Sequence, residues 1–189
     1  MRAVTTLPYG RPLTRADLEL MPDDGHRYEL LDGVLLVTPA PTPTHQRVAF
    51  ELAVLLREAC PRHLEVFIAP LAVALADDTE LQPDVLVARR ADLAQWGLPG
   101  PPLLAVEVLS PSTRRFDLMS KRSRFEAAGA PSYWVVDPDG PSIRAWDLRD
   151  GRYVEISYVE RDAAFEATAP FAVTVVPATL VAEPDARVQ

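Results

Sequence analysis

Apolar runs with two different periodicities alternate along this chain of 189 residues, and their order limits the folds that it can form. Alternating or continuous apolar runs predict strands, whereas apolar residues spaced by three and four predict a helix face. The expected order is helix, hairpin, helix, strands, helix, strands. This order favours an α/β fold in which helices flank a mixed β-sheet. We find no internal repeat, and we predict a single domain over residues 1–189 with its core at about 14–176.

Turn and cap residues bound the expected elements. Asp32-Gly33 lies between two apolar runs, and this dipeptide favours a two-residue hairpin because both turn positions need positive φ. Thr42 or Thr44 is expected to cap a long helix, which Pro61 ends. The other helices are expected at 14–20 and 117–128, the latter capped by Asp117. The run 64–75 is expected to form one long or two short strands. Further strands are expected at 28–31, 34–38, 84–88, 103–109, 133–136, 143–148, 153–159 and 171–176, the last closing the sheet.

Composition excludes several classes of protein. Hydrophobic residues make up 48% and charged residues 24% of the chain, which is ordinary for a globular protein. The single cysteine, Cys60, excludes an internal disulfide. No apolar run is long enough for a membrane helix and no signal-peptide segment is present, so we expect a cytoplasmic protein without membrane contact. The glycines form no nucleotide-binding motif, the histidines lack zinc-ligand spacing, and His45 is expected to be a core histidine.

The charge of the chain is unevenly distributed. Its net value of −8 disfavours a protein that coats nucleic acid through a broad basic surface. Between residues 114 and 124, however, five basic residues accompany one aspartate, so this segment carries +4 and the remainder −12. Its arginines, Arg114, Arg115, Arg122 and Arg124, are therefore candidates for local contact with nucleic-acid phosphates.

Glu107 is the most informative single residue, because it interrupts the apolar run 103–109. An ionised carboxylate in such surroundings is costly unless a metal, a cation or hydrogen bonds compensate it. Asp84 opens a second apolar run in a similar setting. If the two strands are neighbours, both acids can project from one sheet edge and, with water and a backbone carbonyl such as that of Val108, suit Mg²⁺ or Mn²⁺ better than zinc. Taken singly, each acid also fits a turn cap or an ion pair with arginine.

Lys121 is the one lysine among 19 basic residues. It shares a helix face with Leu118, Phe125 and Ala128, at spacings of three, four and three, so its ammonium is expected to point inward. A lysine on such a face needs a carboxylate or an anionic ligand, and Glu107 lies just across the intervening loop. The pattern fits either a buried salt bridge between the two or a metal-plus-lysine site for a phosphodiester.

Pro83-Asp84, Glu107 and Lys121 together resemble the PD-(D/E)XK nuclease site, in which two acids hold the metal and a lysine acts on the attacking water. The usual lysine, two residues after the glutamate, would fall at Leu109, so the helix must supply the amine instead. The ordered stretches YELLDG at 28–33, PTHQ at 43–46, EVLSPS at 107–112, KR at 121–122 and GAPSYWVVDP at 129–138 are similar to those of the Uma-two family of bacterial restriction-endonuclease-like proteins.

This resemblance implies a restriction-endonuclease-like core and an endonuclease that hydrolyses DNA with Mg²⁺ or Mn²⁺. It implies that Asp84 and Glu107 hold the ion, that Lys121 stabilises developing negative charge, and that Glu29 is a further acid near the metal. DNA is then the expected partner, and a homodimer is left open. Two other classes remain: a non-catalytic interaction protein that keeps the fold, which the net charge of −8 favours, and a metal-dependent hydrolase of a small phosphorylated substrate.

Overall fold

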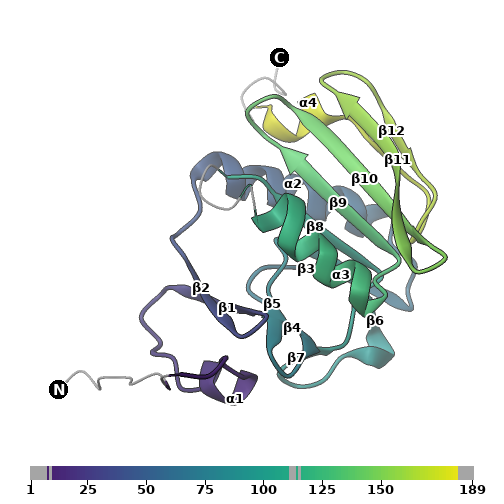
Figure 1. Ribbon diagram of the computed structural model, residues 1–189. Coiled ribbons are helices and arrows are strands. Elements are labelled where there is room, and N and C mark those ends of the chain that lie inside the picture. The colour runs from purple at the N-terminus through teal and green to yellow at the C-terminus, as the bar shows by residue number, and fades with distance from the viewer. Residues whose placement is uncertain (1–7, 9, 111–113, 115, 183–189) are drawn as a thin grey trace.

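The structure is a computed structural model that describes residues 8, 10–110, 114 and 116–182. Its largest sheet has six strands in the order β11-β10-β9-β8-β6-β3. Their bounds are β3 Leu64–Ile68, β6 Val85–Arg89, β8 Leu104–Val108, β9 Ser132–Asp137, β10 Ser142–Arg149 and β11 Arg152–Glu160. Neighbouring strands are antiparallel except β8 and β9, which makes the sheet mixed. Helix α2 (Pro43–Ala59) covers one face and helix α3 (Arg122–Ala128) the other (Figure 1).

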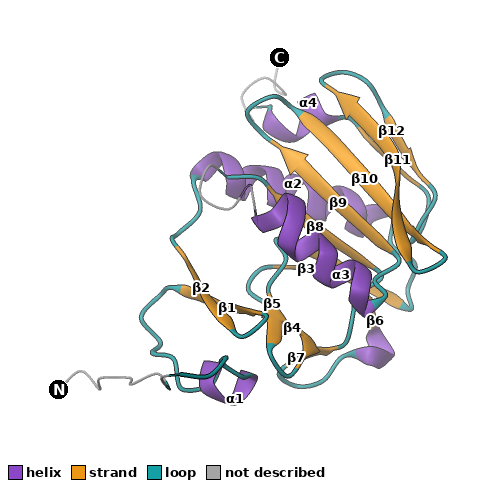
Figure 2. Ribbon diagram, viewed as in Figure 1, coloured by secondary structure: helices purple, strands orange, loops and turns teal. Residues whose placement is uncertain are grey.

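A second sheet of five strands lies beside the first, at the lower left of Figure 2. Its order is β2-β1-β5-β4-β7, and only β4 and β7 pair in parallel. The bounds are β1 Arg27–Leu31, β2 Val34–Thr38, β4 Ala72–Ala76, β5 Thr79–Leu81 and β7 Gly97–Pro99, with the short helix α1 (Arg15–Leu18) against β1. The predicted α/β class is therefore confirmed, with two mixed sheets in place of one.

Two apolar clusters fill the opposite faces of the six-stranded sheet. Leu52 and Leu56 of α2 pack with Val85 and Val106 on one face. On the other face, Phe125 of α3 joins an apolar cluster that also holds residues of the five-stranded sheet. Because side chains alternate along a strand, residues 84 and 107 belong to this second face, between α3 and the smaller sheet. The second face therefore receives both acids that the sequence singles out.

The β1–β2 hairpin forms as its turn residues predict. Asp32 and Gly33 have φ of 53° and 73°, which are the two positive values that the turn requires. The turn is then fixed to its surroundings, because Gly33 accepts a hydrogen bond from the Leu13 amide and donates one to the Asp78 carbonyl. These bonds fix the end of β1 to the segment before α1 and to the turn between β4 and β5.

Helix α2 begins and ends at the predicted residues. The Thr42 hydroxyl accepts a hydrogen bond from the His45 amide at 3.2 Å, which identifies Thr42 and not Thr44 as the N-cap. The helix ends at Ala59, one residue before Cys60 and two before Pro61. This start places His45 in the first turn, with its side chain directed inward.

The connection from β8 to β9 differs from the expected helix. Phe116–Lys121 forms a π-helical segment that runs directly into α3, and Gly129 ends α3 with φ of 85°. The prediction that Asp117 caps the helix is wrong, because Asp117 lies inside the helical segment and its carboxylate is buried against Lys121 four residues later. Wide π-helical turns often occur at functional sites.

Three further differences separate the structure from the expected elements. The run 64–75 forms two short strands, β3 and β4, which is one of the two expected alternatives, but these strands lie in different sheets. The last expected strand does not close the main sheet, because β13 (Val173–Val175) pairs with β12 (Phe165–Ala167) as a separate ribbon before helix α4 (Pro177–Val181). The three-residue strands β5 and β7 were not predicted, since such short segments carry too little periodicity. Within the described residues, no helix is both long and apolar enough to cross a membrane.

Candidate functional site

Asp84 and Glu107 lie at facing positions of two paired strands. The register pairs Val85 of β6 with Val106 of β8, so the next residues outward, Asp84 and Glu107, come opposite one another. Both side chains are almost fully buried. Asp84 is fixed further by the Val108 amide, which donates a hydrogen bond to its Oδ2 at 2.8 Å. The expectation that the two acids sit on neighbouring strands is therefore confirmed.

Lys121 and Glu29 join these acids from two other elements. The Lys121 ammonium lies 3.1 Å from Glu29 Oε1, 3.3 Å from Glu107 Oε1 and 3.5 Å from Asp117 Oδ1. Only 1% of the lysine is exposed, which confirms its predicted inward position. Glu29 comes from β1, and the backbone amide of Gln82 donates a hydrogen bond to its Oε1 at 2.8 Å. We use the name acid–lysine cluster for these side chains together with Arg27, whose contacts follow below: Glu29, Asp84, Glu107, Asp117, Lys121 and Arg27.

Arg27 and His45 bind the outer side of Asp84. Arg27 Nη1 donates to Asp84 Oδ1 at 3.0 Å, and Arg27 Nε lies 3.7 Å from Glu29 Oε2. His45 Nε2 lies 3.2 Å from Asp84 Oδ2. Burial by itself raises the pKa of Asp84, but the hydrogen bond from His45 and the charges of His45, Arg27 and Lys121 outweigh it and lower that pKa to about 2. Asp84 is therefore ionised at neutral pH.

Glu107 responds to the same surroundings in the opposite direction. Burial raises its pKa well above the ordinary value, and the neighbouring carboxylates of Asp117, Asp84 and Glu29 raise it further, whereas Lys121 lowers it. Burial lowers the pKa of Lys121, but the three carboxylates around it raise that pKa beyond the ordinary value. The lysine is therefore a permanent cation, whereas Glu107 takes up a proton more readily than an exposed glutamate does.

The charges of the acid–lysine cluster do not cancel. If all four carboxylates are ionised, the two permanent cations, Arg27 and Lys121, leave an excess of two negative charges, which a proton on Glu107 or a positive charge on His45 reduces. Buried charge of this kind is compensated by protons or by a bound cation. The acids offer only oxygen atoms as metal ligands. Mg²⁺ and Mn²⁺ prefer oxygen ligands, so these residues fit a hard divalent ion. The excess equals the charge of one such ion.

The acids are nevertheless held apart by the two cations. In the part of the chain that the structure describes, no three His, Cys, Asp or Glu side chains converge on one metal position. An ion on Asp84 and Glu107 would thus take its other ligands from water and from a carbonyl, for which the sequence proposes that of Val108. This ligand set stays a prediction.

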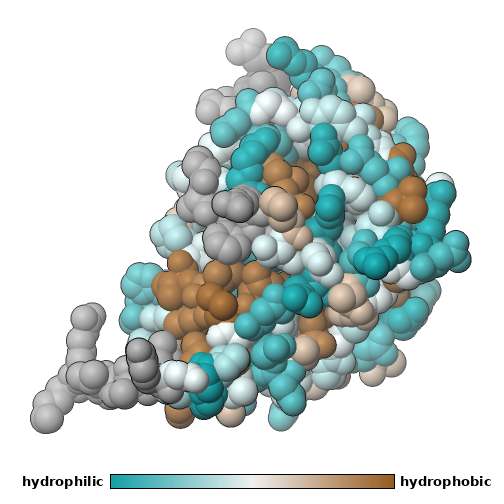
Figure 3. All heavy atoms as spheres, in the orientation of Figure 1, coloured by the Kyte–Doolittle hydropathy of each residue, from teal (hydrophilic) through white to brown (hydrophobic). Residues whose placement is uncertain are grey.

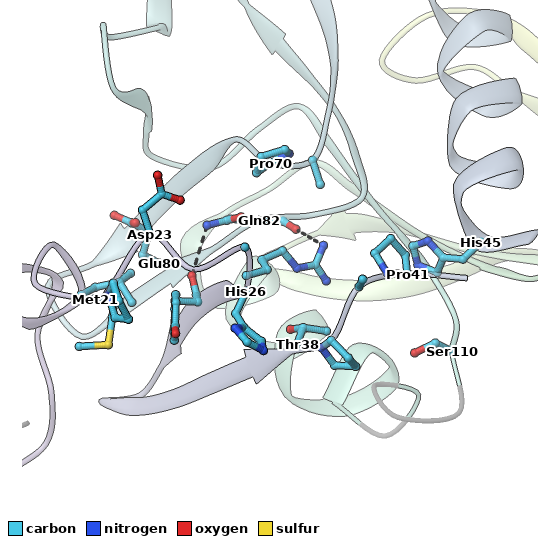
Figure 4. A pocket seen from close by; sticks show the side chains of 18 of the residues that line it. Met21, Asp23, His26, Thr38, Pro41, His45, Pro70, Glu80, Gln82 and Ser110 are labelled. Carbon is cyan, nitrogen blue, oxygen red and sulfur yellow. Dashed lines mark hydrogen bonds between the residues drawn. The ribbon is translucent and has the colours of Figure 1, made fainter. Parts of the chain in front are cut away.

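A cleft of about 790 Å³ reaches the cluster from the protein surface. It lies between the α1–β1 connection, the β2–α2 connection and the first turn of α2. Figure 4 shows Gln82 in its middle, between Met21 and Asp23 at one end and His45 and Ser110 at the other. Arg27 and His45 line the cleft and also bind Asp84, so these two side chains separate the solvent-filled space from the buried carboxylates.

The basic segment does not form one surface with this cleft. Its described arginines contact three different partners: Arg114 pairs with Asp137 at 2.7 Å, Arg122 lies 4.9 Å over the Trp146 ring, and Arg124 pairs with Asp32 at 2.6 Å. None of these three lines the cleft. Arg115 lies outside the described residues. Contact between the segment and nucleic acid stays a prediction.

Sequence reasoning missed Arg27 and did not identify the partners of His45 and Asp117. His45 was expected to be buried and inward, which is confirmed, but its contact with Asp84 depends on how α2 packs against the strand edge. Arg27 carries no signal of burial, because its neighbours in sequence are polar. Asp117 lies four residues before Lys121, a spacing that could have suggested their contact on one helix face.

Comparisons with known proteins identify the family and the fold. Residues 15–179 match the model of the Uma2 (Uma-two) family, which is described as "Putative restriction endonuclease". The fold is similar to the crystal structure of a "putative nuclease belonging to DUF820" from Anabaena variabilis ATCC 29413, with a TM-score of 0.72 and 16% identity over 90% of this chain and all of that one. A search of curated proteins finds no match. Because the family model spans most of its length, the chain belongs to the Uma-two family of restriction-endonuclease-like proteins.

Proposed function

We propose that this protein is a divalent-metal-dependent endonuclease that hydrolyses phosphodiester bonds in DNA. One observation carries the proposal: two carboxylates on paired strands share a buried cluster with one lysine, and the cluster has more carboxylates than permanent cations. Family membership and the fold support the same reaction class. A structural salt-bridge core would instead be expected to balance its charges.

In this mechanism, Asp84 and Glu107 hold Mg²⁺ or Mn²⁺, and the Val108 carbonyl is a further ligand. When bound, such an ion lowers the pKa of a water and neutralises charge on the scissile phosphate. Lys121 stays protonated, so it stabilises negative charge on the attacking oxygen and does not act as a general base. Glu29 holds Lys121 in place from β1. Glu107 gives up its proton before it can act as a ligand.

The direct test is incubation of the purified protein with supercoiled plasmid and with single-stranded DNA. Nicking is expected with Mg²⁺ or Mn²⁺ and should stop when chelator is added. Glu107→Gln and Lys121→Met are the inactive variants, and Arg149→Gln is a matched control on an exposed strand end far along the chain from the cluster. Cleavage by wild type that persists with Glu107→Gln would point to a contaminating nuclease and refute the assignment.

A second candidate is hydrolysis of a small phosphorylated substrate. The cleft favours it over DNA, because about 790 Å³ matches the size of small-ligand sites, and the acids Glu19, Asp23 and Glu80 in its lining repel a polyanion more strongly than a small substrate with one phosphate group. Of the described lining residues, Arg27 alone is an arginine or lysine. Metal binding without cleavage of any nucleic acid, together with hydrolysis of a generic phosphodiester such as bis-p-nitrophenyl phosphate, would select this candidate. Neither binding nor cleavage would select a non-catalytic interaction protein.

A further inference from the structure

We propose that Arg27 competes with the divalent ion for Asp84, and that it turns into the cleft to contact the phosphate of the substrate when the ion binds. This inference rests on the proposed metal-dependent function. Arg27, which the sequence did not place in the site, would in this way couple binding of the ion to binding of the substrate.

The two oxygens of Asp84 are occupied in different ways. Oδ2 accepts a hydrogen bond from the Val108 amide at 2.8 Å and lies 3.2 Å from His45 Nε2. The amide belongs to β8 and cannot leave without disrupting the sheet. Oδ1 is bound by Arg27 Nη1 at 3.0 Å. The guanidinium therefore takes one of the two lone-pair sites of Oδ1, and an ion on the other site would lie directly beside it.

The charges of the guanidinium and of the ion oppose each other at this position. The guanidinium lies beside Glu29 and Asp84, and its charge also interacts with that of Glu107. These are the same carboxylates that would attract the ion. A divalent ion placed on Asp84 would lie within a few ångströms of the guanidinium, and like charges at that separation repel strongly in a partly buried site. Binding of one cation thus weakens binding of the other.

Arg27 is the one of the two cluster cations that can leave. Lys121 is enclosed by three carboxylates and only 1% of it is exposed. The Arg27 side chain is 20% exposed and lines the cleft. Its backbone is fixed in β1 by pairing with Thr38, so rotation of the side chain alone is sufficient. Once turned outward, it presents the planar set of donors that binds phosphate in a bidentate manner.

The first test is calorimetric titration of Mn²⁺ into wild type and Arg27→Gln. Arg15→Gln is the matched control, because it removes the same charge from a residue that pairs with Glu80 of the cleft but does not touch Asp84. Arg27→Gln is expected to bind Mn²⁺ about tenfold more tightly or better, since a contacting like charge is removed. Arg15→Gln should remain within about threefold of wild type, because its charge acts only at longer range. Equal or weaker Mn²⁺ binding by Arg27→Gln overturns the competition.

The second test measures binding of a fluorescent DNA oligonucleotide with Ca²⁺ present, a metal chosen to hold the ion site while limiting cleavage. Arg27→Gln is expected to bind this DNA about tenfold more weakly than wild type, although it binds the metal more tightly. A general folding defect would weaken both. Tighter metal binding with unchanged DNA binding would refute the phosphate contact.

Crystals of the wild-type protein soaked in Mn²⁺ test the movement without any variant. The anomalous signal should lie at Asp84 and Glu107, with Arg27 turned away from Oδ1. Manganese on Asp84 with the 3.0 Å contact intact would overturn the inference but leave the proposed function in place. Failure of the wild type to bind Mn²⁺ at all would instead refute the proposed function, and this inference with it.

Discussion

Replacement of Asp84 and of Glu107 by their amides should change stability in opposite directions when no metal is present. The folded protein lowers the pKa of Asp84 from 3.8 to about 2. Each pKa unit corresponds to about 1.4 kcal/mol, so ionised Asp84 contributes about 2 kcal/mol to the free energy of unfolding. Asp84→Asn loses this contribution at neutral pH. In a chain of this length, the melting temperature should fall by about 4–8 °C.

The pH dependence follows from the sign of each shift. Because the folded-state pKa of Asp84 is depressed, its contribution is complete above pH 3.8 and is lost as the pH falls toward 2. Glu107 has a raised pKa, so the folded protein holds a proton that the unfolded chain releases above its ordinary value of 4.5. Stability due to this group is therefore lost as the pH rises above 4.5. Glu107→Gln copies the protonated acid and should be at least as stable as wild type at pH 7.

Urea unfolding with chelator present, at intervals from pH 7 to pH 3.5, measures both effects. Lys121 keeps Glu29 and Asp117 as partners in Glu107→Gln, so loss of one contact should not reverse the sign. The difference between wild type and Asp84→Asn should stay constant from pH 7 to pH 5 and shrink below pH 4. If Glu107→Gln were destabilised at pH 7 as strongly as Asp84→Asn, the excess of negative charge would not exist.

Three further predictions concern other parts of the fold and site. Lys121→Met should reduce the free energy of unfolding by about 3–5 kcal/mol at pH 7, since it leaves buried carboxylates without their cation, and circular dichroism during urea unfolding measures the loss. Gly33→Ala should lower the melting temperature by several degrees, because φ of 73° disfavours alanine and its Cβ would collide with Pro12; unchanged melting would contradict the turn geometry. Arg114→Ala combined with Arg115→Ala should reduce the slope of log affinity for DNA against log salt by about two, and an unchanged slope would remove the basic segment from the interface.

Most of the buried cluster could be predicted from the sequence, because a charged residue among apolar neighbours on one strand or helix face indicates a buried charge. Glu107 stands in an apolar strand and Lys121 on an apolar helix face, and both patterns identify an ionisable group that needs a partner inside the protein. Glu29 was implied only by resemblance to the family, and the structure places it 3.1 Å from the lysine.

The missed features depend on contacts between elements that are distant in sequence. Arg27 reaches Asp84 only because the hairpin packs against the edge of the larger sheet, and the sequence around Arg27 gives no sign of this. A break in the run 64–75 was one expected alternative, but which sheet each half joins depends on the bend at residues 69–70 and on strand partners that an apolar run does not specify. Figure 3 shows an apolar surface over the β1–β2 hairpin, where Val34 and Val37 of β2 are exposed. The sequence predicted the strands of this hairpin but not that apolar side chains of β2 would face solvent.

The parallel pairing of β8 and β9 explains how a lysine so far from Glu107 in sequence can serve the same site. Parallel neighbours cannot be joined by a tight turn, so segment 109–131 must travel back along the sheet before β9 begins. Its return path carries α3 over the face that holds Glu107, and Leu109 packs in the same apolar cluster as Phe125 of that helix. Leu109 lies two residues after Glu107 on the same face of the sheet, and Lys121 reaches this face from the returning segment. The parallel connection thus brings an ammonium within 3.3 Å of a carboxylate on the strand that the chain has just left.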